Sequence, residues 1–315
     1  MQDQFDRDIN YLRLSVTDLC NLRCVYCMPE SGVTKLRHED ILSVEEIEEI
    51  VRAAAALGIT KVRLTGGEPL VRHGILDICR RVAAVQGITE TCLTTNGTLL
   101  PKYARELREV GVNRLNTSLD TLDPVRYAEI TRGGDLNDAL RGIDAARDAG
   151  FDVLKINTVL IGGVNDGEIR DLVDLTRDGR THVRFIELMP IGASADWAGA
   201  RFLENSAVLR AVPELVAADS DGVARLYRLP DTDGTVGLIS PISSHFCPTC
   251  NRVRVTSDGK LKPCLHSSDE INLRGLHGDA LAETLRAAIY GKPQHHTLDG
   301  TTTSNSARSM YAIGG

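Results

Sequence analysis

One repeated unit constrains the fold of this chain more than any other feature: short β-like runs alternate with helical stretches. The runs lie at residues 10–17, 61–65, 89–95, 112–119, 153–161 and 182–188. The helical stretch after the first run opens with a capping box, because Ser43 is followed three residues later by Glu46, and Gly58 ends it. Strands that alternate with helices at this spacing are typical of βαβ units on a parallel sheet.

Unusual residues follow these runs at their carboxyl ends. They are Gly66-Gly67-Glu68-Pro69, Thr94-Thr95-Asn96-Gly97, Ser118-Leu119-Asp120, Asn157 and Met189-Pro190. In (β/α) barrels the active site is assembled from the loops at that face. An open doubly wound sheet also places ligands at the carboxyl ends of its strands, but mostly at one switch point. We therefore expect an α/β fold, a partial TIM-like (β/α)6 barrel in which the six runs supply one site.

The pattern changes after Gly192. Residues 211–235 combine Asp and Gly clusters with short apolar runs, which indicates loops and hairpins. The segment Ser257-Asp258-Gly259 lies between two β-like stretches and predicts a β-hairpin. The tail after Gly291 is rich in Thr, Ser, His and Gly, and we expect it to be mobile unless a partner or a pocket orders it. The predicted domains are a barrel at 1–215 and a C-terminal extension with hairpins at 216–315.

Three cysteines, Cys20, Cys24 and Cys27, follow the first predicted strand with the spacing C-x-x-x-C-x-x-C. We call them the first triplet. Closely spaced cysteines in an odd number suit a metal or an iron–sulfur cluster better than disulfides. On a four-iron cluster, three thiolates leave one iron open to a ligand that is not protein. The alternative is a zinc site that lacks a fourth ligand, with His38 as the only histidine nearby in the sequence.

A second triplet, Cys247, Cys250 and Cys264, lies in the C-terminal extension. It has a C-x-x-C pair and a distant third cysteine, with His245 and His266 close by. From the spacing alone, a four-ligand zinc ribbon and a second cluster are about equally favoured.

The composition excludes several function classes. A net charge of −7 argues against a general nucleic-acid binder. The polar, acidic N-terminus does not resemble a signal peptide, and no apolar run reaches membrane-spanning length. We expect a cytoplasmic protein that binds neither nucleic acid nor membrane, in which Cys79 and Cys92 are small core residues.

Cations recur on the predicted strands of this acidic protein. Arg13, Arg63 and Lys155 lie on strands of the barrel, and Arg252 and Arg254 follow Cys250. Alternate residues of a strand share a face, so the last two arginines could both donate to phosphate or guanine. The alternative is a solvated hairpin face.

The segment 17–27, together with Gly66-Gly67-Glu68-Pro69, resembles the radical S-adenosylmethionine superfamily. The second triplet, the segment 251–254 and the terminal Gly-Gly resemble more narrowly the GTP 3′,8-cyclase family, that of molybdenum cofactor biosynthesis protein A. This resemblance implies two 4Fe–4S clusters, one on each triplet, with guanine on the open iron of the second. It implies S-adenosylmethionine contacts at Tyr26, Gly67, Ser118 and Met189. The implied GTP contacts are Arg13, Arg63, Thr94, Lys155, Arg252, Val253 and Arg254, with Lys61 and Arg184 as weaker candidates.

The resemblance also implies the reaction. The first cluster reduces S-adenosylmethionine to a 5′-deoxyadenosyl radical, and GTP becomes 3′,8-cyclo-7,8-dihydro-GTP, the first step toward molybdopterin, catalysed by a lyase. The expected catalytic residues are Arg252, Arg254, Gly314 and Gly315. The two glycines are included because glycine backbone, which has no side chain, can enter a crowded site.

The partners implied by the family are a flavodoxin-type electron donor and a cyclic pyranopterin synthase, and the chain is expected to be a monomer or homodimer. Two other classes stay open: a radical enzyme that acts on a peptide, and a non-enzymatic zinc or electron-transfer protein.

Overall fold

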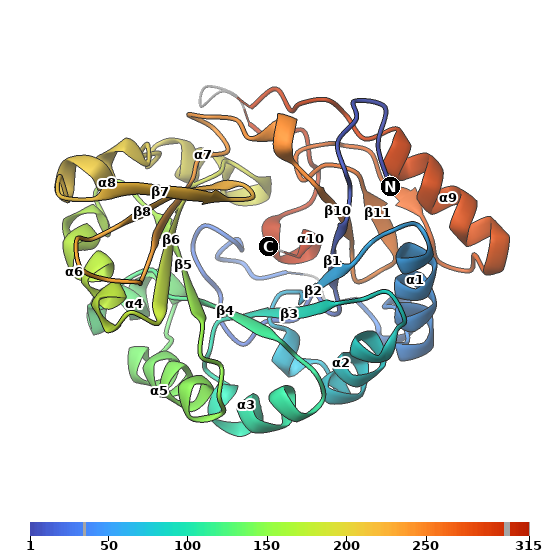
Figure 1. The fold of residues 1–315 in the computed structure, drawn as a ribbon, viewed down its shortest axis with the longest axis horizontal. Coiled ribbons are helices and arrows are strands. Elements are labelled where there is room, and N and C mark those ends of the chain that lie inside the picture. Colours follow the sequence, from blue (N-terminus) through green and yellow to red (C-terminus); the bar gives the residue numbers. More distant parts are fainter. Residues whose placement is uncertain (34–35, 299–302, 315) are drawn as a thin grey trace.

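The computed structural model describes residues 1–33, 36–298 and 303–314 (Figure 1). Within them, the six predicted runs form parallel strands that pair in chain order. These strands are β1 Tyr11–Ser15, β2 Lys61–Thr65, β3 Glu90–Thr95, β4 Arg114–Ser118, β5 Leu154–Leu160 and β6 Thr181–Glu187. The predicted partial barrel is confirmed.

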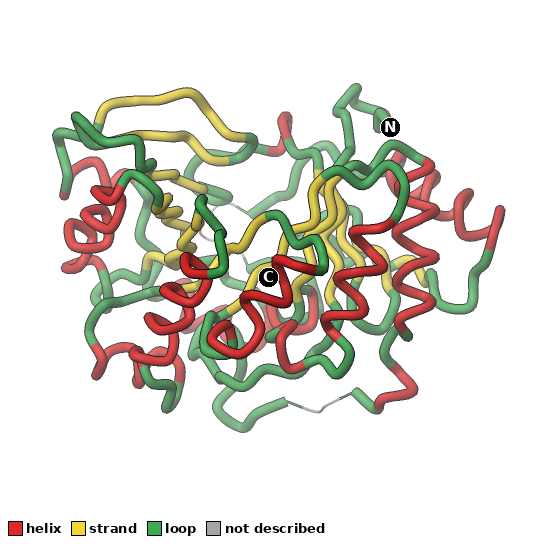
Figure 2. Tube along the Cα trace, turned by 60° about the horizontal axis from the view of Figure 1, so that its bottom comes forward, coloured by secondary structure: helices red, strands yellow, loops and turns green. Residues whose placement is uncertain are grey.

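Helices cover the outside of this sheet (Figures 1 and 2). They are α1 Val44–Ala56, α2 Ile75–Ala84, α3 Leu100–Glu109, α4 Pro124–Thr131, α5 Leu136–Asp148 and α6 Ile169–Asp174. The capping box at the start of α1 is present, since the Ser43 hydroxyl accepts from the Glu46 amide and the Glu46 carboxylate accepts from the Ser43 amide. Between the helices and the sheet lies a continuous apolar core, which includes the fully buried Cys79, as predicted. Cys92 is also fully buried, but it lies outside this core: its thiol donates to the Glu90 carboxylate and lies near Arg63.

The helical stretch before β5 is broken into α4 and α5, which the sequence pattern did not predict. Arg132 ends α4 in the left-handed conformation, and Gly133 continues it with φ of 106°. A side chain at Gly134 would meet the Thr131 hydroxyl at 2.6 Å. The break places the Arg132 guanidinium on the carbonyls of Arg23 and Met28, so it secures the loop of the first triplet.

The C-terminal extension continues the same sheet on both sides. Strand β10 Arg252–Val255 pairs parallel with β1, and β9 Val236–Ile239 pairs parallel with β6. Antiparallel strands follow at each edge: β11 Lys260–Lys262 and β12 Ile271–Asn272 beyond β10, and β8 Ala224–Arg228 and β7 Val216–Asp221 beyond β9. The two predicted hairpin regions are confirmed as β7–β8 and β10–β11. The described strands form one open sheet in the order β12-β11-β10-β1-β2-β3-β4-β5-β6-β9-β8-β7.

The remaining helices belong to the second half of the chain. They are α7 Ala195–Gly199, α8 Ser206–Ala211, α9 Gly278–Tyr290 and α10 Met310–Ile313. No helix among the described residues is both long and apolar enough to span a lipid bilayer.

The tail turns back into the barrel, so that α10 lies near the centre of the ring of strands (Figure 1). Arg308 donates to both oxygens of Asp258, at 2.9 and 2.8 Å, and to both oxygens of Glu270, at 2.7 and 2.8 Å. Beyond this anchor, Ile313 is 1% exposed. The sequence predicted a mobile tail unless a partner or a pocket orders it. The described part of the tail packs into the barrel, so this exception applies.

Candidate active site

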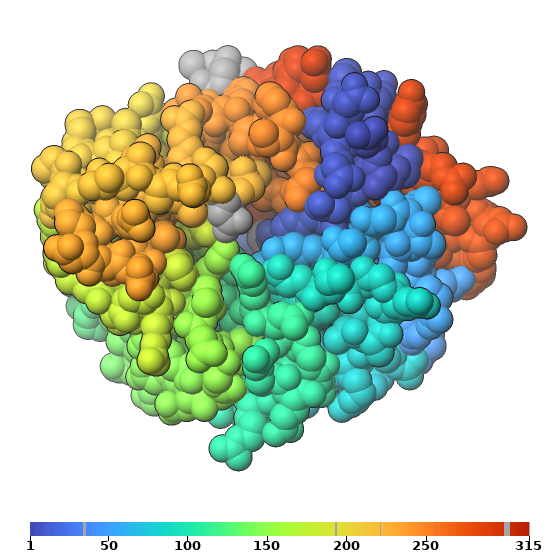
Figure 3. Space-filling view, viewed as in Figure 1, coloured from blue at the N-terminus to red at the C-terminus, as the bar shows by residue number. Residues whose placement is uncertain are grey.

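The barrel encloses a cavity of about 450 Å³ that is lined by both cysteine triplets. Its opening is visible as a hollow at the centre of the face in Figure 3. Residues from the carboxyl ends of β1 to β6, from β10 and from the tail contribute to its wall. The structure thus brings the two distant triplets to one space, as the sequence analysis expected.

The loop of the first triplet is held against the end of β2. The Gly67 amide donates to the Thr17 carbonyl at 2.9 Å, and the Glu68 amide donates to the Leu19 carbonyl at 2.7 Å. A side chain at Gly67 would meet the Leu19 carbonyl at 2.4 Å, and one at Gly66 would meet the Thr17 carbonyl at 2.6 Å. Glycine is therefore needed at these two positions because the backbone after β2 packs directly against the loop that carries the first triplet.

The three cysteines of the first triplet are half-buried and lie beside one another. Burial raises the pKa of Cys20 to about 11 and that of Cys27 to about 12, where the charge of Cys20 adds to the effect. The pKa of Cys24 is also raised, by burial and by the charges of Asp120 and of the other two cysteines. A bound metal reverses this balance, because its positive charge stabilises the thiolates. The donor set fits an iron–sulfur cluster.

Two buried carboxylates stand near the first triplet. Glu68, 1% exposed, accepts from the amides of Leu70 and Asn96 and from the Thr95 hydroxyl. Asp120 accepts from the Tyr26 hydroxyl at 2.7 Å and from the Val159 amide at 2.8 Å. Burial raises the pKa of Glu68 to about 7 and that of Asp120 to about 6. Neither was predicted as a site residue, although both lie in motifs at the strand ends.

The second triplet has the opposite electrostatic environment. Burial alone would raise the pKa of Cys250, but the charges of Arg252 and Lys292 and hydrogen bonds from Arg252 lower it to about 7. Arg252 also stacks over the Phe246 ring, at 5.2 Å from its centroid. Cys250 therefore favours the thiolate even before a metal binds, whereas burial raises the pKa of Cys247 despite the nearby charge of Lys292.

Histidines lie close to the second triplet. A zinc site there would need one of them as its fourth ligand. The ligand atoms of His245, Cys247 and His296 all lie within 4.8 Å of one another. The rings of His245 and His266 each lie 4.4 Å from the ring of His296. The described geometry by itself is compatible with either a cluster on the cysteines or a mixed Cys–His site.

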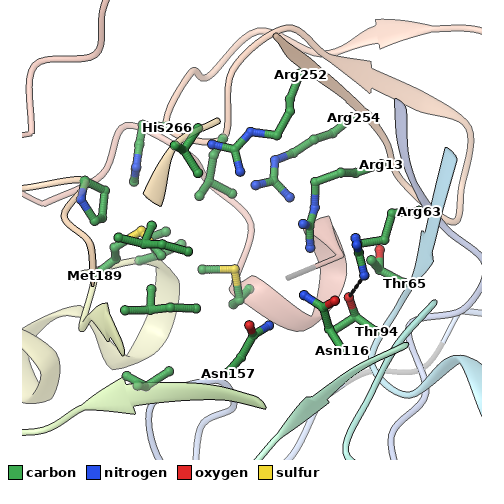
Figure 4. A pocket seen from close by; sticks show the side chains of 18 of the residues that line it. Arg13, Arg63, Thr65, Thr94, Asn116, Asn157, Met189, Arg252, Arg254 and His266 are labelled. Atoms are coloured by element: carbon green, nitrogen blue, oxygen red, sulfur yellow. Dashed lines mark hydrogen bonds between the residues drawn. The ribbon is translucent and has the colours of Figure 1, made fainter. Parts of the chain in front are cut away.

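A row of arginines lines the same cavity as the two triplets. Arg254, Arg13 and Arg63 are register partners on the neighbouring strands β10, β1 and β2. Their guanidinium groups point into the same cavity, with Arg252 beside them (Figure 4). Burial, together with the charges of neighbouring arginines, lowers the pKa of Arg13 to about 10 and holds that of Arg254 well below its usual range. Such crowded cations are stabilised by an anionic ligand.

The other predicted ligand residues divide into three groups. Most line the cavity: Tyr26, Lys61, Gly67, Thr94, Ser118, Lys155, Arg184 and Met189. Val253 does not, because its side chain is 1% exposed within the apolar core. Gly315 lies outside the described residues.

Gly314 adopts a conformation that only glycine tolerates well. Its φ is +86°, and a side chain there would meet the Thr65 hydroxyl at 2.4 Å. Its carbonyl accepts a hydrogen bond of 2.9 Å from Arg254. Three residues earlier, the Tyr311 backbone lies close enough to Cys27 to oppose the rise in the pKa of that thiol. The tail thus contacts both the first triplet and the arginine row.

Family models cover most of the chain. Residues 14–176 match the model of the Radical SAM superfamily, and residues 181–298 match that of Molybdenum Cofactor Synthesis C. A "GTP 3′,8-cyclase" of Alkaliphilus metalliredigens is 52% identical over 320 residues that cover 100% of both chains. A protein of the same name from Geobacter sulfurreducens is 47% identical and covers 99% of both.

Solved structures share the fold. The Streptococcus suis protein SuiB, bound to S-adenosylmethionine, superposes with a TM-score of 0.62 at 16% identity and covers 89% of this chain and 68% of its own. The protein anSMEcpe, with bound AdoMet, gives 0.56 at 13% identity and covers 94% and 81%. The resemblance found in the sequence is confirmed, and the chain belongs to the radical S-adenosylmethionine superfamily and, within it, to the GTP 3′,8-cyclase family.

Proposed function

We propose that this chain converts GTP into 3′,8-cyclo-7,8-dihydro-GTP, the first step toward molybdopterin. The observation that carries the proposal is that one cavity holds the arginine row and both cysteine triplets. A triphosphate needs several desolvated cations, and a radical reaction needs its generator close to the bound substrate. Both requirements meet in this cavity.

Two 4Fe–4S clusters and S-adenosylmethionine are the cofactors. Cys20, Cys24 and Cys27 would hold the first cluster, and Cys247, Cys250 and Cys264 the second. When bound, the first cluster supplies the electron that cleaves S-adenosylmethionine, and this cleavage drives hydrogen-atom abstraction from GTP. Around it we assign S-adenosylmethionine contacts to Tyr26, Gly67, Ser118 and Met189. Glu68 and Asp120 add negative charge that suits this sulfonium cation.

The substrate site extends from the arginine row to the second triplet. Arg254, Arg13 and Arg63 would bind phosphates as planar, multidentate donors, supported by Lys155 and Thr94. Arg252 lies next to Cys250 and would face the guanine end of GTP. Val253 would contribute backbone contacts only. The buried amide oxygen of Asn116 has no hydrogen-bond partner within the described residues and faces this cavity (Figure 4). A bound nucleotide would offer it one.

The tail would complete the floor of the substrate site. The Gly314 carbonyl orients Arg254, and the closely packed backbone of the tail excludes water from the reacting atoms. Arg252, Arg254 and Gly314 are therefore our candidates for the catalytic residues, with Gly315 beyond the described tail.

We also propose two domains, the barrel at 1–215 and the C-terminal extension at 216–315, whose strands continue the sheet of the barrel. A cytoplasmic location, a flavodoxin-type donor, a pyranopterin synthase as acceptor of the product and a monomeric or homodimeric state are also proposals.

Anaerobic reconstitution tests the proposed function. The loaded protein is incubated with GTP, S-adenosylmethionine and dithionite, and the products are separated by liquid chromatography with mass detection. We expect 5′-deoxyadenosine together with an isomer of GTP that carries a C3′–C8 bond. Formation of 5′-deoxyadenosine at the same rate without GTP, and without this isomer, would contradict the assignment.

A further inference from the structure

Lys292 is a buried lysine at the second triplet to which the substrate and cofactor assignments give no role. Its side chain lines the cavity, yet the residue is only 2% exposed. The Lys292 ammonium donates a 2.7 Å hydrogen bond to the carbonyl of Pro263, the residue that directly precedes Cys264. Its charge also acts on Cys247 and Cys250. One cation thus lies close to all three cysteines.

A separate network holds Lys292 in this place. Arg7 is buried in an ion pair with Asp3, at 2.6 Å. The same guanidinium donates to the carbonyls of Cys247 at 3.0 Å, Lys292 at 3.4 Å and Pro293 at 2.8 Å. Because Arg7 joins the backbone of the triplet to the backbone of Lys292, the lysine cannot move away without disturbing the cysteine loop.

The positive charge of Lys292 has no acidic partner among the described residues. A second buried lysine near the triplet, Lys262, shows the contrast, because Glu270 lies 3.4 Å from its ammonium. Within the described part of the chain the Lys292 ammonium donates to a neutral carbonyl, so its charge is available to the anions beside it. A buried cation next to thiolates stabilises the form of the site that carries more negative charge.

We propose that Lys292 is an outer-sphere charge that raises the reduction potential of the cluster on the second triplet. The inference rests on the proposed function, in which Cys247, Cys250 and Cys264 hold a 4Fe–4S cluster. One-electron reduction makes such a cluster more negative by one charge, and net charge is one determinant of its potential. The ammonium favours the reduced form and so raises the potential. Lys292 is a positioning residue here, since it acts through the cluster.

The test uses the full chain in a background in which Cys20, Cys24 and Cys27 are alanine, so that only the second cluster can assemble. Lys292→Gln and Lys292→Met remove the charge, and Lys292→Arg keeps it. Lys260→Gln is the matched control, because it removes a lysine of the β10–β11 hairpin whose ammonium reaches the exposed side chain of Asn272. Iron and sulfide analysis measures loading, and a dithionite titration followed by electron paramagnetic resonance measures the midpoint potential.

We expect the neutral variants to shift the midpoint to a more negative value, while Lys292→Arg and Lys260→Gln stay close to the background. A loaded Lys292→Gln with an unchanged midpoint overturns the inference and leaves the proposed function intact, as does a loss of GTP affinity without a shift. If both neutral variants fail to fold, as judged by circular dichroism, Lys292 is a core residue and the inference is wrong. Failure of the background itself to assemble a cluster contradicts the proposed function instead.

Discussion

The two cysteine triplets look alike in the sequence but lie in opposite electrostatic environments. Near the first triplet stand the carboxylates of Glu68 and Asp120, which disfavour thiolates there. Near the second stand the cations of Arg252 and Lys292, which lower the pKa of Cys250 to about 7. A carboxylate environment suits a sulfonium ligand, whereas a cationic one suits a nucleotide. The difference indicates that the triplets have different partners, although their donor sets are similar.

Removing one cysteine from each triplet should separate these roles and have the largest effect. Cys24→Ala should reduce formation of 5′-deoxyadenosine to background. Cys250→Ala should retain cleavage of S-adenosylmethionine but lose the GTP isomer. Both products are measured in one chromatogram, with iron content as the check on loading. Equal loss of both products in both loaded variants would show that the triplets form one functional unit.

Arg254 connects the two regions, because it hydrogen-bonds the tail and lies in the arginine row that faces the cavity. Arg254→Ala removes charge-assisted hydrogen bonds of about 1.5 to 3 kcal/mol each, so KM for GTP should rise about 10- to 100-fold. Arg254→Lys should recover only part of this, since an ammonium lacks the planar fork. Steady-state kinetics over a range of GTP concentrations measure the effect. An unchanged KM in Arg254→Ala would remove this residue from the substrate site.

Gly314→Ala tests the tail at its closest contact. The new methyl group meets the Thr65 hydroxyl at 2.4 Å in a backbone with φ of +86°. Strain of this kind costs about 1 to 3 kcal/mol, so we expect the tail to withdraw and turnover to fall about tenfold. Gly163→Ala is the matched control, because that glycine has φ of +72° but open space around it. Equal losses of turnover in both variants would argue for a general folding defect.

The anchor of the tail should have the smallest effect and a characteristic pH dependence. Burial alone would raise the pKa of Asp258 and Glu270, but their hydrogen bonds to Arg308 keep both values lowered. A lowered carboxyl pKa contributes stability above the unfolded value and loses it as pH falls through the folded value. Arg308→Gln should therefore destabilise the protein by about 1 kcal/mol at pH 7.

Denaturant unfolding of wild type and Arg308→Gln, followed from pH 7 to pH 3, measures this difference. The difference in unfolding free energy between wild type and Arg308→Gln should be largest at pH 7 and should decrease as the two carboxylates become protonated. A gap that stays constant down to pH 3 would mean that the anchor acts through packing rather than charge.

Much of the barrel could be predicted because its signals are local. Each βα unit carries its own strand, cap and stop, as Ser43, Glu46 and Gly58 do around α1. The triplets could also be recognised from the sequence, because the spacing of Cys20, Cys24 and Cys27, and that of Cys247 and Cys250, lies within a single short segment of the chain. Residues such as Arg13 and Arg63 followed from their place on predicted strands.

What could not be predicted depends on contacts between distant segments. The parallel pairing of β10 with β1 joins residues that lie about 240 positions apart, and the same holds for the Arg7 network. Glu68 and Asp120 sit in visible motifs, but only their burial beside the first triplet shows their electrostatic effect. Val253 was predicted with its neighbours, and the alternation of the strand turns its side chain to the core.

Electron paramagnetic resonance of the second cluster tests the central claim most directly. In the variant with alanine at Cys20, Cys24 and Cys27, we expect about four irons per chain and a spectrum of the reduced cluster that changes when GTP is added. This result would place a cluster and the substrate together at the second triplet. Zinc without sulfide at that triplet, or an unchanged spectrum while equilibrium dialysis shows bound GTP, would contradict the account.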